Sequence, residues 1–343
     1  MIWDVEDAVP YVGSAGKDIE KDSNGMIYEC APMEGVTGDL FRQAQRLHFA
    51  AADCYYTPFL SPTASRVLAA RELREVDPSH NEGIRVVPQL MGHEPNDFLW
   101  MTRALADLGY DEVNLNLGCP SGTVVTKKKG AGLLAERDLL RRMLDGIFDL
   151  SPLPISIKTR LGMEAAAEFP PILELYNDYP IKELIVHPRV QADQYKNHPN
   201  MDLFAYALEH SRAPVCYNGD LFSAADVRAF SERFPTVQRV MLGRGLAANP
   251  GLIGELKTGE KPTAEKMRSF HDELFRRTSE RIPDRRALLF RMKEAWRYFG
   301  CSFEGAEKTL KLIRRAQNLT DYENAVTRLF ADCPVRENAG FTG

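Results

Sequence analysis

The sequence has no apolar run that approaches the ~20 residues needed to cross a bilayer, so we expect no membrane partner. Its six cysteines are scattered and form no CxxC pair, and a zinc or other metal site is therefore not expected. Residues 1–25 are acidic and polar, without the cationic start and apolar stretch of a signal peptide. These absences predict a flexible leader over 1–25, a cytoplasmic protein and reduced thiols.

The net charge of -5 argues at first against a polyanionic partner, but the charge is unevenly distributed. Residues 262–330 hold 15 Lys and Arg against 10 Asp and Glu, a net charge of +5. The rest of the chain holds 28 basic and 38 acidic residues, a net charge of -10. Phosphate binding depends on the local field, so the carboxy-terminal segment is the candidate nucleic-acid surface.

Short apolar, β-rich runs recur along the first three quarters of the chain. Several are continuous, such as ELIVH and RVMLG, which is typical of parallel strands buried on both faces. Strands that alternate with helices predict a parallel sheet, and eight such units close a (β/α)8 TIM barrel, with a doubly wound open sheet as the alternative. The runs are 27–31, 53–56, 85–90, 112–116, 155–160, 183–187, 215–218 and 239–242, and the helical segments are 94–108, 136–149, 167–177 and 223–234.

The pattern changes after Asn249 and Pro250. Residues 254–263, GELKTGEKPT, are rich in Gly, Pro and charge and predict a linker. No β-rich run follows, and the remaining periodicity predicts a small helical bundle. We therefore expect a barrel over 26–258 and a helical domain over 259–335. The predicted helices are 266–281, 285–299, 305–317 and a fourth that starts near Tyr322.

Polar and reactive residues follow the predicted strands, and in a parallel barrel these loops carry function. The sequences NGD, Asn218 to Asp220, and GRG, Gly243 to Gly245, follow the seventh and eighth strands, where barrels commonly bind phosphate. Glycine lets backbone N–H groups approach phosphate oxygens, and Arg244 can bind an anion through two N–H groups. Two ordinary glycine turns are the alternative interpretation.

Three further residues are candidates for chemistry. Lys158 lies on a strand expected to be buried on both faces, where lysine is uncommon unless paired or functional. His187 ends the next strand with Arg189 beside it, which favours contact with a phosphate or cofactor. Cys119 follows the fourth strand and is placed to exchange a proton with a substrate, although an inert loop thiol fits the sequence equally well.

The segment 113–132, VNLNLGCPSGTVVTKKKGAG, resembles the signature of the tRNA-dihydrouridine synthase family. Asn116, Gly118, Cys119 and Pro120, followed by GA at 130–131, fall where that family has them. APMEGVT, QLMG, SIKTRLG, VHPR, NGD and LGRG occur in the family's order, and the resemblance covers roughly residues 28–325. One departure is HPRVQADQYKN, which has Val190 where the family usually has Thr.

The resemblance implies an FMN-binding barrel that reduces uridine to dihydrouridine in tRNA, with NADPH or NADH as the reductant of the flavin. It implies that Cys119 donates a proton, that Asn116 and Arg189 contact the substrate, and that the helical domain binds RNA. No stable protein partner is expected. The implied cofactor-binding residues are Pro32, Met33, Glu34, Gln89, Lys158, His187, Asn218, Gly219, Asp220, Gly243 and Arg244.

Two other functions stay open at this stage. An FMN barrel oxidoreductase could act on a free pyrimidine-like small molecule, but such an enzyme does not need the basic carboxy-terminal helices. A non-catalytic RNA-binding barrel is the second alternative. The presence of Cys119 together with Lys158 and Gln89 favours an enzyme over that alternative.

Overall fold

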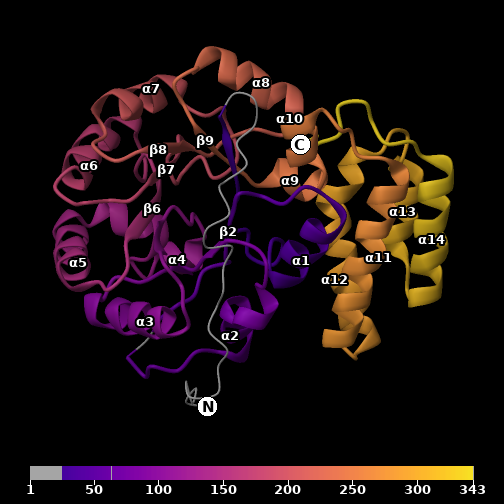
Figure 1. Ribbon diagram of the computed structural model, residues 1–343, viewed down its shortest axis with the longest axis horizontal. Helices are drawn as coiled ribbons and strands as arrows, with labels where there is room; N and C mark the ends of the chain where they lie inside the picture. The colour runs from indigo at the N-terminus through magenta and orange to yellow at the C-terminus, as the bar shows by residue number, and fades with distance from the viewer. Residues whose placement is uncertain (1–24, 63, 343) are drawn as a thin grey trace.

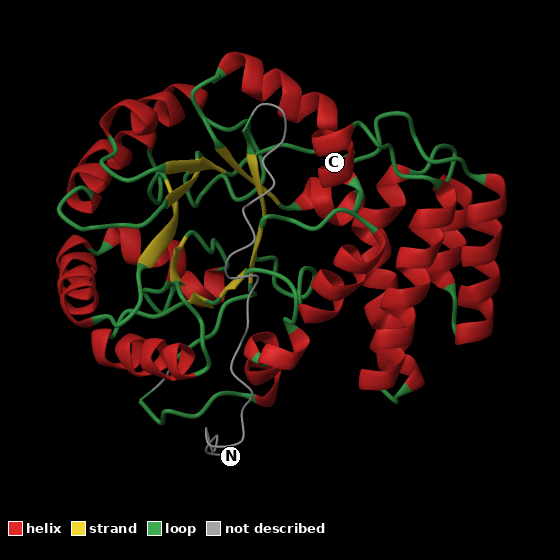
Figure 2. Cartoon of the chain, viewed as in Figure 1, coloured by secondary structure: helices red, strands yellow, loops and turns green. Residues whose placement is uncertain are grey.

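The computed structural model describes residues 25–62 and 64–342, so the predicted leader, except for Gly25, lies outside the described residues. Figure 1 shows a barrel ringed by helices, with the carboxy-terminal helices packed against one side of it. The strands lie at the centre of the ring (Figure 2). They are β1 (Ile27–Cys30), β2 (Cys54–Tyr56), β3 (Val86–Val87), β4 (Gln89–Leu90), β5 (Val113–Leu117), β6 (Ile155–Arg160), β7 (Leu184–His187), β8 (Val215–Tyr217) and β9 (Arg239–Leu242).

The sheet closes on itself through Pro88. Its order is β3-β2-β1-β9-β8-β7-β6-β5-β4, and all pairings are parallel. β3 and β4 are two halves of one run, divided at Pro88 because proline has no N–H to give to a ladder. Since β3 pairs with β2 and β4 pairs with β5, this run joins the two edges. The predicted TIM barrel is confirmed, with its third strand split, and the open-sheet alternative is wrong.

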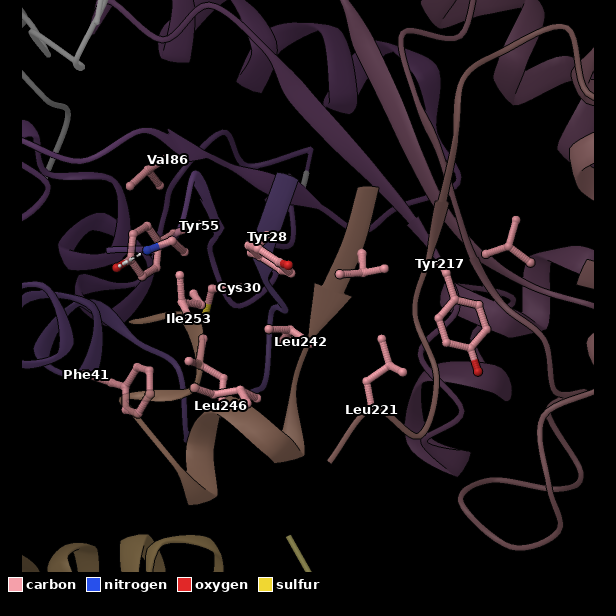
Figure 3. Close-up of a cluster of buried hydrophobic side chains, with 14 of the residues drawn as sticks. Tyr28, Cys30, Phe41, Tyr55, Val86, Tyr217, Leu221, Leu242, Leu246 and Ile253 are labelled. Atoms are coloured by element: carbon pink, nitrogen blue, oxygen red, sulfur yellow. Dashed lines mark hydrogen bonds between the residues drawn. The ribbon is translucent and has the colours of Figure 1, made fainter. Parts of the chain in front are cut away.

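Side chains alternate along each strand between the barrel interior and the surrounding helices. On β6, Ser156 and Lys158 face the interior, whereas Ile155 and Ile157 pack into the main apolar core. This alternation places polar groups inside the barrel without exposing the core. Figure 3 shows the outer layer near β1 and β9, where labelled side chains of strands and helices meet: Tyr28, Cys30, Phe41, Leu242, Leu246 and Ile253.

The helices around the barrel include all four that the sequence predicts. α8 begins with the expected capping box, in which Ser223 Oγ accepts from Asp226 N and Asp226 Oδ2 accepts from Ser223 N at 2.8 Å. The barrel helices are α1 (Asp39–His48), α2 (Ala70–Val76), α3 (Pro95–Asp107), α4 (Gly122–Val125), α5 (Arg137–Leu150), α6 (Phe169–Tyr176), α7 (Met201–His210), α8 (Ala224–Arg233), α9 (Arg244–Ala248) and α10 (Leu252–Thr258).

The prediction of a linker over 254–263 is wrong in its first half. Helix α10 extends to Thr258, because Leu252 and Ile253 bury an apolar face that outweighs the local glycine content. Gly259, with a φ of 76°, ends this helix in the left-handed conformation that favours glycine. Only the short segment after it connects α10 to the next helix.

The carboxy-terminal helices confirm the predicted bundle. Arg281 at the end of α11 binds both carboxylate oxygens of Asp39 on α1, at 2.7 and 2.6 Å, and Phe41 packs edge-on against Phe270. A domain boundary at 258/259 stays a prediction. No described helix combines the length and apolar character required to cross a membrane. The helices are α11 (Ala264–Arg281), α12 (Arg285–Phe299), α13 (Glu307–Arg315) and α14 (Leu319–Asp332).

Two buried carboxylates share one guanidinium near the amino ends of the strands. Arg239 Nη1 lies 3.3 Å from Glu29 Oε1 and 3.4 Å from Glu183 Oε2. Glu29 is 1% exposed, and its burial, followed by the neighbouring Glu183 carboxylate, raises its pKa well above the usual value. The folded barrel therefore binds a proton at Glu29 more tightly than the unfolded chain does.

Replacing Glu29 by Gln should stabilise the protein at pH 8 and have little effect near pH 5. A carboxyl group with a raised folded-state pKa costs stability as the pH rises through that pKa, and an amide does not ionise. We expect the thermal midpoint at pH 8 to rise by roughly 2–4 °C. The control Glu112→Gln should lower the midpoint, because Glu112 binds both Arg85 and Lys182. An unchanged or lower midpoint for Glu29→Gln at pH 8 would contradict this account.

Candidate active site

Cys119 lies two residues beyond the end of β5, on a loop at the carboxyl end of the barrel. Its side chain is half-buried. The backbone N–H groups of Gly118 and Cys119 both donate to Asn116 Oδ1, at 3.0 and 2.9 Å. Asn116 is the last inward-facing residue of β5, so the strand itself holds the start of the loop in place.

The glycines after the loop let the returning chain pack against Cys119. Gly130 has a φ of 55°, and a Cβ there would lie 3.0 Å from both Cβ and the carbonyl oxygen of Cys119. A Cβ on Gly132 would lie 2.6 Å from the carbonyl oxygen of Val125. The Cys119 carbonyl also accepts from Ala131 N at 3.1 Å. The GAG sequence is therefore required by close packing around the cysteine loop.

A chain of buried amides continues from Asn116 across the barrel interior. Asn116 Nδ2 donates to Gln89 Oε1 at 2.7 Å, and Gln89 Nε2 donates to Asn114 Oδ1 at 2.8 Å. Asn114 Nδ2 then donates to Ser156 Oγ at 2.9 Å. Gln89, Asn114 and Ser156 are fully buried, so water does not compete for these bonds.

Lys158 and Cys119 have altered proton affinities. Burial, followed by the nearby Arg160 guanidinium, lowers the pKa of Lys158 to about 8. Burial raises the pKa of the Cys119 thiol, opposed in part by the Ser121 backbone N–H and by the charges of Arg160 and Lys158. The thiol is therefore protonated at neutral pH. Lys158 has no hydrogen-bond or ion-pair partner among the described residues, which leaves its ammonium group available to a ligand.

His187 is neutral and Arg189 is fully occupied by protein. Burial, followed by the charge of Arg160, lowers the pKa of His187 well below its usual value. His187 Nε2 accepts from Arg189 Nη1 at 3.1 Å, which places the proton of the neutral ring on Nδ1. Arg189 also donates to Asp220 and to two loop carbonyls, and thereby uses all five of its N–H groups. Its predicted contact with substrate would have to displace one of these bonds and stays a prediction.

Arg244, by contrast, keeps most of its donors free. Its Nη2 binds Asp220 Oδ1 at 2.7 Å, the one hydrogen bond of this guanidinium to the described residues. The group lies over the rings of Tyr195, Phe222 and Phe341, 4.7 to 5.3 Å from their centroids. Asp220 therefore connects Arg189, whose N–H groups are all bonded to protein, to Arg244, which can still bind an anion.

The remaining predicted residues surround the same mouth. Asn218 Nδ2 donates to the Met241 carbonyl at 2.8 Å, which ties the loop after β8 to β9. A Cβ on Gly219 would lie 2.1 Å from the Tyr217 hydroxyl oxygen, so any larger residue there would have to displace the Tyr217 ring. A Cβ on Gly243 would lie 3.2 Å from Met33 Sδ. These close approaches pack the loops after β1, β8 and β9 tightly against one another.

Pro32 and Glu34 lie on the loop after β1 with Met33 between them. Met33 packs against the apolar cluster inside the barrel, and its N–H donates to Thr37 Oγ1 at 2.8 Å. Glu34 faces outward and binds Arg71 at 2.7 Å. Pro32 and Met33 are half-buried at the mouth, whereas Glu34 points to the rim. The cofactor contacts assigned to all three stay predictions.

The model of the dihydrouridine synthase (Dus) family matches residues 29–333. This chain belongs to the dihydrouridine synthase family. It is accordingly a flavin-dependent oxidoreductase. The match spans both the barrel and the carboxy-terminal helices, so it includes every site residue described above.

Individual relatives agree with this membership. The chain is 26% identical over 257 residues to a probable tRNA-dihydrouridine synthase of Rickettsia bellii, covering 74% of this chain and 77% of that protein. It is 29% identical over 243 residues to a tRNA-dihydrouridine(16) synthase of Aquipseudomonas alcaligenes, covering 68% and 76%. A 2-naphthoyl-CoA reductase complex aligns with a TM-score of 0.50 at 10% identity, covering 68% of this chain and 50% of that chain, which shows the fold alone.

In this family member, Tyr195 is a mouth residue that the sequence reasoning missed. Tyr195 as a whole residue is 58% exposed, although the Arg160 and Arg244 guanidinium carbons lie 5.5 and 5.0 Å from the centroid of its ring. Arg160 holds the surrounding loops through bonds to the carbonyls of Gly118, Val190 and Gln194. A tyrosine in the loop after β7, at the end of an otherwise polar sequence, was the signal that could have identified it.

Replacing Asp220 by Ala should destabilise the protein strongly. The change leaves two guanidinium groups without their carboxylate, and that of Arg189 is 1% exposed. Removing one partner of a buried ion pair typically costs about 3–5 kcal/mol, and the partial exposure of Asp220 places the expected loss near 3 kcal/mol. Denaturant unfolding measures it. Asp178→Ala, which breaks an exposed pair with Arg141, is the control and should cost less than ~1 kcal/mol. A loss for Asp220→Ala as small as that expected for the control would show that the ion pairs of Asp220 do not stabilise the fold.

Proposed function

We propose that this chain reduces uridine to 5,6-dihydrouridine in tRNA, using bound FMN and NADPH or NADH as the reductant. The observation that carries the proposal is the protonated, half-buried thiol of Cys119, whose backbone N–H is bound by Asn116, at the mouth of a barrel that belongs to the dihydrouridine synthase family. The relatives named as tRNA-dihydrouridine synthases support tRNA as the substrate.

The unpaired donors at the mouth fit a flavin mononucleotide. Among the described residues, the ammonium group of Lys158 has no partner, and Gln89 Nε2 has a second N–H that donates to no acceptor. Both groups suit the electron-rich edge of a flavin ring. Arg244 has free N–H groups for a phosphate, beside His187 and the loops after β8 and β9. When bound and reduced, FMN supplies a hydride to C6 of the uracil.

Cys119 completes the reduction by supplying the proton. Hydride addition at C6 leaves an electron pair at C5, and the S–H bond of Cys119 breaks as the C5–H bond forms. The thiolate that results lies beside Lys158 and Arg160, whose positive charges favour it. The raised pKa of the thiol and the two nearby cations therefore serve opposite halves of one cycle. The raised pKa keeps the Cys119 thiol protonated before the reaction, and the charges of Lys158 and Arg160 stabilise the thiolate after it.

The target base must leave its stack to reach this site. Tyr195 offers an exposed aromatic face at the mouth, next to Arg160 and Arg244. Flat aromatic rings stack on unpaired bases and gain about 1–3 kcal/mol per base. We assign Tyr195 as a stacking surface for the turned-out uridine or its neighbour.

Not all arginines of the carboxy-terminal helices are available to RNA. Arg276 and Arg277 bind Glu273 at 2.7 and 2.6 Å, and Arg276 also binds Glu280. Their charge is largely neutralised. Among the exposed arginines that have no acidic partner in the described residues, the proposed phosphate contacts are Arg285, Arg286, Arg314 and Arg315.

Replacing Cys119 by Ala should lower uridine reduction by about 10²–10⁴-fold, the usual contribution of a positioned general acid. Ser should recover little, because a hydroxyl is a far weaker acid than a thiol. FMN released by heating, identified by mass, and NADPH oxidation should stay near wild-type levels. Dihydrouridine is measured by mass spectrometry of the RNA. Cys301→Ala is the control, since this thiol is also partly exposed but lies on the helical domain. Near wild-type dihydrouridine formation by the Ala and Ser variants would remove Cys119 from the mechanism.

Two matched double substitutions test the RNA surface. Arg314→Ala with Arg315→Ala should weaken tRNA binding, and the slope of log affinity against log salt should fall by about 2 if both groups contact phosphates. Arg276→Ala with Arg277→Ala removes the same formal charge from ion-paired residues and should change the slope little. The measurement is a salt titration of tRNA binding. If neither double substitution changes the affinity or the slope, the helical domain is not the RNA surface, and a free pyrimidine becomes the better substrate.

A further inference from the structure

We propose that Asn114 and Ser156 are positioning residues for Cys119, which act through the side chains of Gln89 and Asn116. The inference rests on the proposed role of Cys119 as proton donor. Neither Asn114 nor Ser156 reaches the mouth, because both face the barrel interior below it, one residue pair deeper than Asn116 and Lys158. Their influence on the reaction is therefore indirect.

The orientation of all the hydrogen-bonded amides is set at the end nearest Cys119. Two backbone N–H groups, those of Gly118 and Cys119, face one end of the Asn116 amide, and they can only donate. That end must be the oxygen, so the Asn116 nitrogen faces Gln89. Gln89 must then present its own oxygen to Asn116 and its nitrogen to Asn114. Each amide is thus oriented by the one before it.

The same logic ends at a hydroxyl. Asn114 accepts from Gln89 and therefore turns its nitrogen toward Ser156 Oγ, 2.9 Å away. Ser156 accepts this bond and directs its own proton to the Val113 carbonyl, at 3.5 Å. A hydroxyl both accepts and donates, so it satisfies the last amide without requiring another. Turning over any single amide would oppose donor to donor and acceptor to acceptor in a site without water.

Asn114 and Ser156 therefore help to fix the position of the Cys119 thiol. If Asn114 is lost, Gln89 Nε2 loses its acceptor, and rotation of Gln89 releases the Asn116 amide. Asn116 then holds the N–H groups of the cysteine loop less firmly. The Cys119 carbonyl stays bound to Ala131, so the loop loosens on one side without unfolding. A displacement of about 1 Å in a reacting group can cost ~10²-fold in rate.

The experiment compares Asn114→Leu, which keeps the branch at Cγ but cannot form hydrogen bonds, with Ser156→Ala and with a control. Tyr176→Phe is the control. It removes a buried hydrogen bond to Thr159, which lies on the outer face of β6, the strand that carries Ser156. The first readout is the rate at which iodoacetamide alkylates Cys119 in the FMN-loaded protein without RNA, followed by mass spectrometry. The second is kcat for uridine reduction, measured together with FMN content.

We expect Asn114→Leu to raise the alkylation rate several-fold and to lower kcat by about 10- to 100-fold, with FMN content unchanged. Ser156→Ala should shift both in the same direction by less, and it keeps the test decisive if Asn114→Leu does not fold. Tyr176→Phe should leave both at wild-type values. Alkylation and kcat that match Tyr176→Phe in the folded Asn114 or Ser156 variants would overturn the inference. If Cys119→Ala stays active, the proton step fails, but the alkylation rates still decide whether Asn114 positions the loop.

Discussion

In the pairing of β5 with β6, Asn114 lies beside Ser156 and Asn116 beside Lys158, whereas Leu115 and Ile157 lie side by side on the opposite face. This register is the constraint on which the site depends, because a slip of one residue would exchange the two faces. It buries leucine and isoleucine against helices and directs amides and an ammonium group into the barrel. The cysteine loop and the free lysine then follow at fixed heights above the same two strands. The packing of the apolar residues in the core thus determines where the polar groups of the site lie.

Cations that are already paired and cations that are free have different roles in this molecule. Arg189 uses every N–H group on protein and holds the loop after β7, while Arg244, joined to it by Asp220, keeps donors for an anion. The helical domain repeats the contrast, with Arg276 bound to two glutamates and Arg315 exposed without an acidic partner among the described residues. Formal charge along the sequence does not distinguish these groups. Phosphate binding requires arginines with free N–H groups. The arginines whose N–H groups are all bonded to protein hold the loops that position them.

The fold was largely predictable because parallel strands buried on both faces leave continuous apolar runs, and all eight runs became strands. The division of the third strand at Pro88 was not predictable, because it depends on which strands pair with each half. The extent of α10 was not predictable either, because it depends on the burial of Leu252 and Ile253. The candidate site was predictable as a set of residues at one end of the barrel. Its internal contacts were predictable only in part: Asn116 holds the cysteine loop through local bonds to Gly118 and Cys119, but its orientation depends on the bond to Gln89, a residue far away in the sequence.

Burial raises the pKa of several thiols in this barrel, so low acidity alone does not distinguish Cys119. The Cys30 thiol, fully buried in the outer core, has its pKa raised to about 12 by desolvation. Burial and the adjacent Glu29 carboxylate, which disfavours a thiolate, raise the pKa of Cys216 well above its usual value. Two cations, Arg160 and Lys158, oppose the effect of burial at Cys119, whereas one does so at Cys30 and one at Cys216, and Cys119 alone of the three is partly exposed at the mouth. A general acid must both hold a proton and tolerate its loss. Of these three thiols, only Cys119 lies at an opening through which a substrate carbon can reach it.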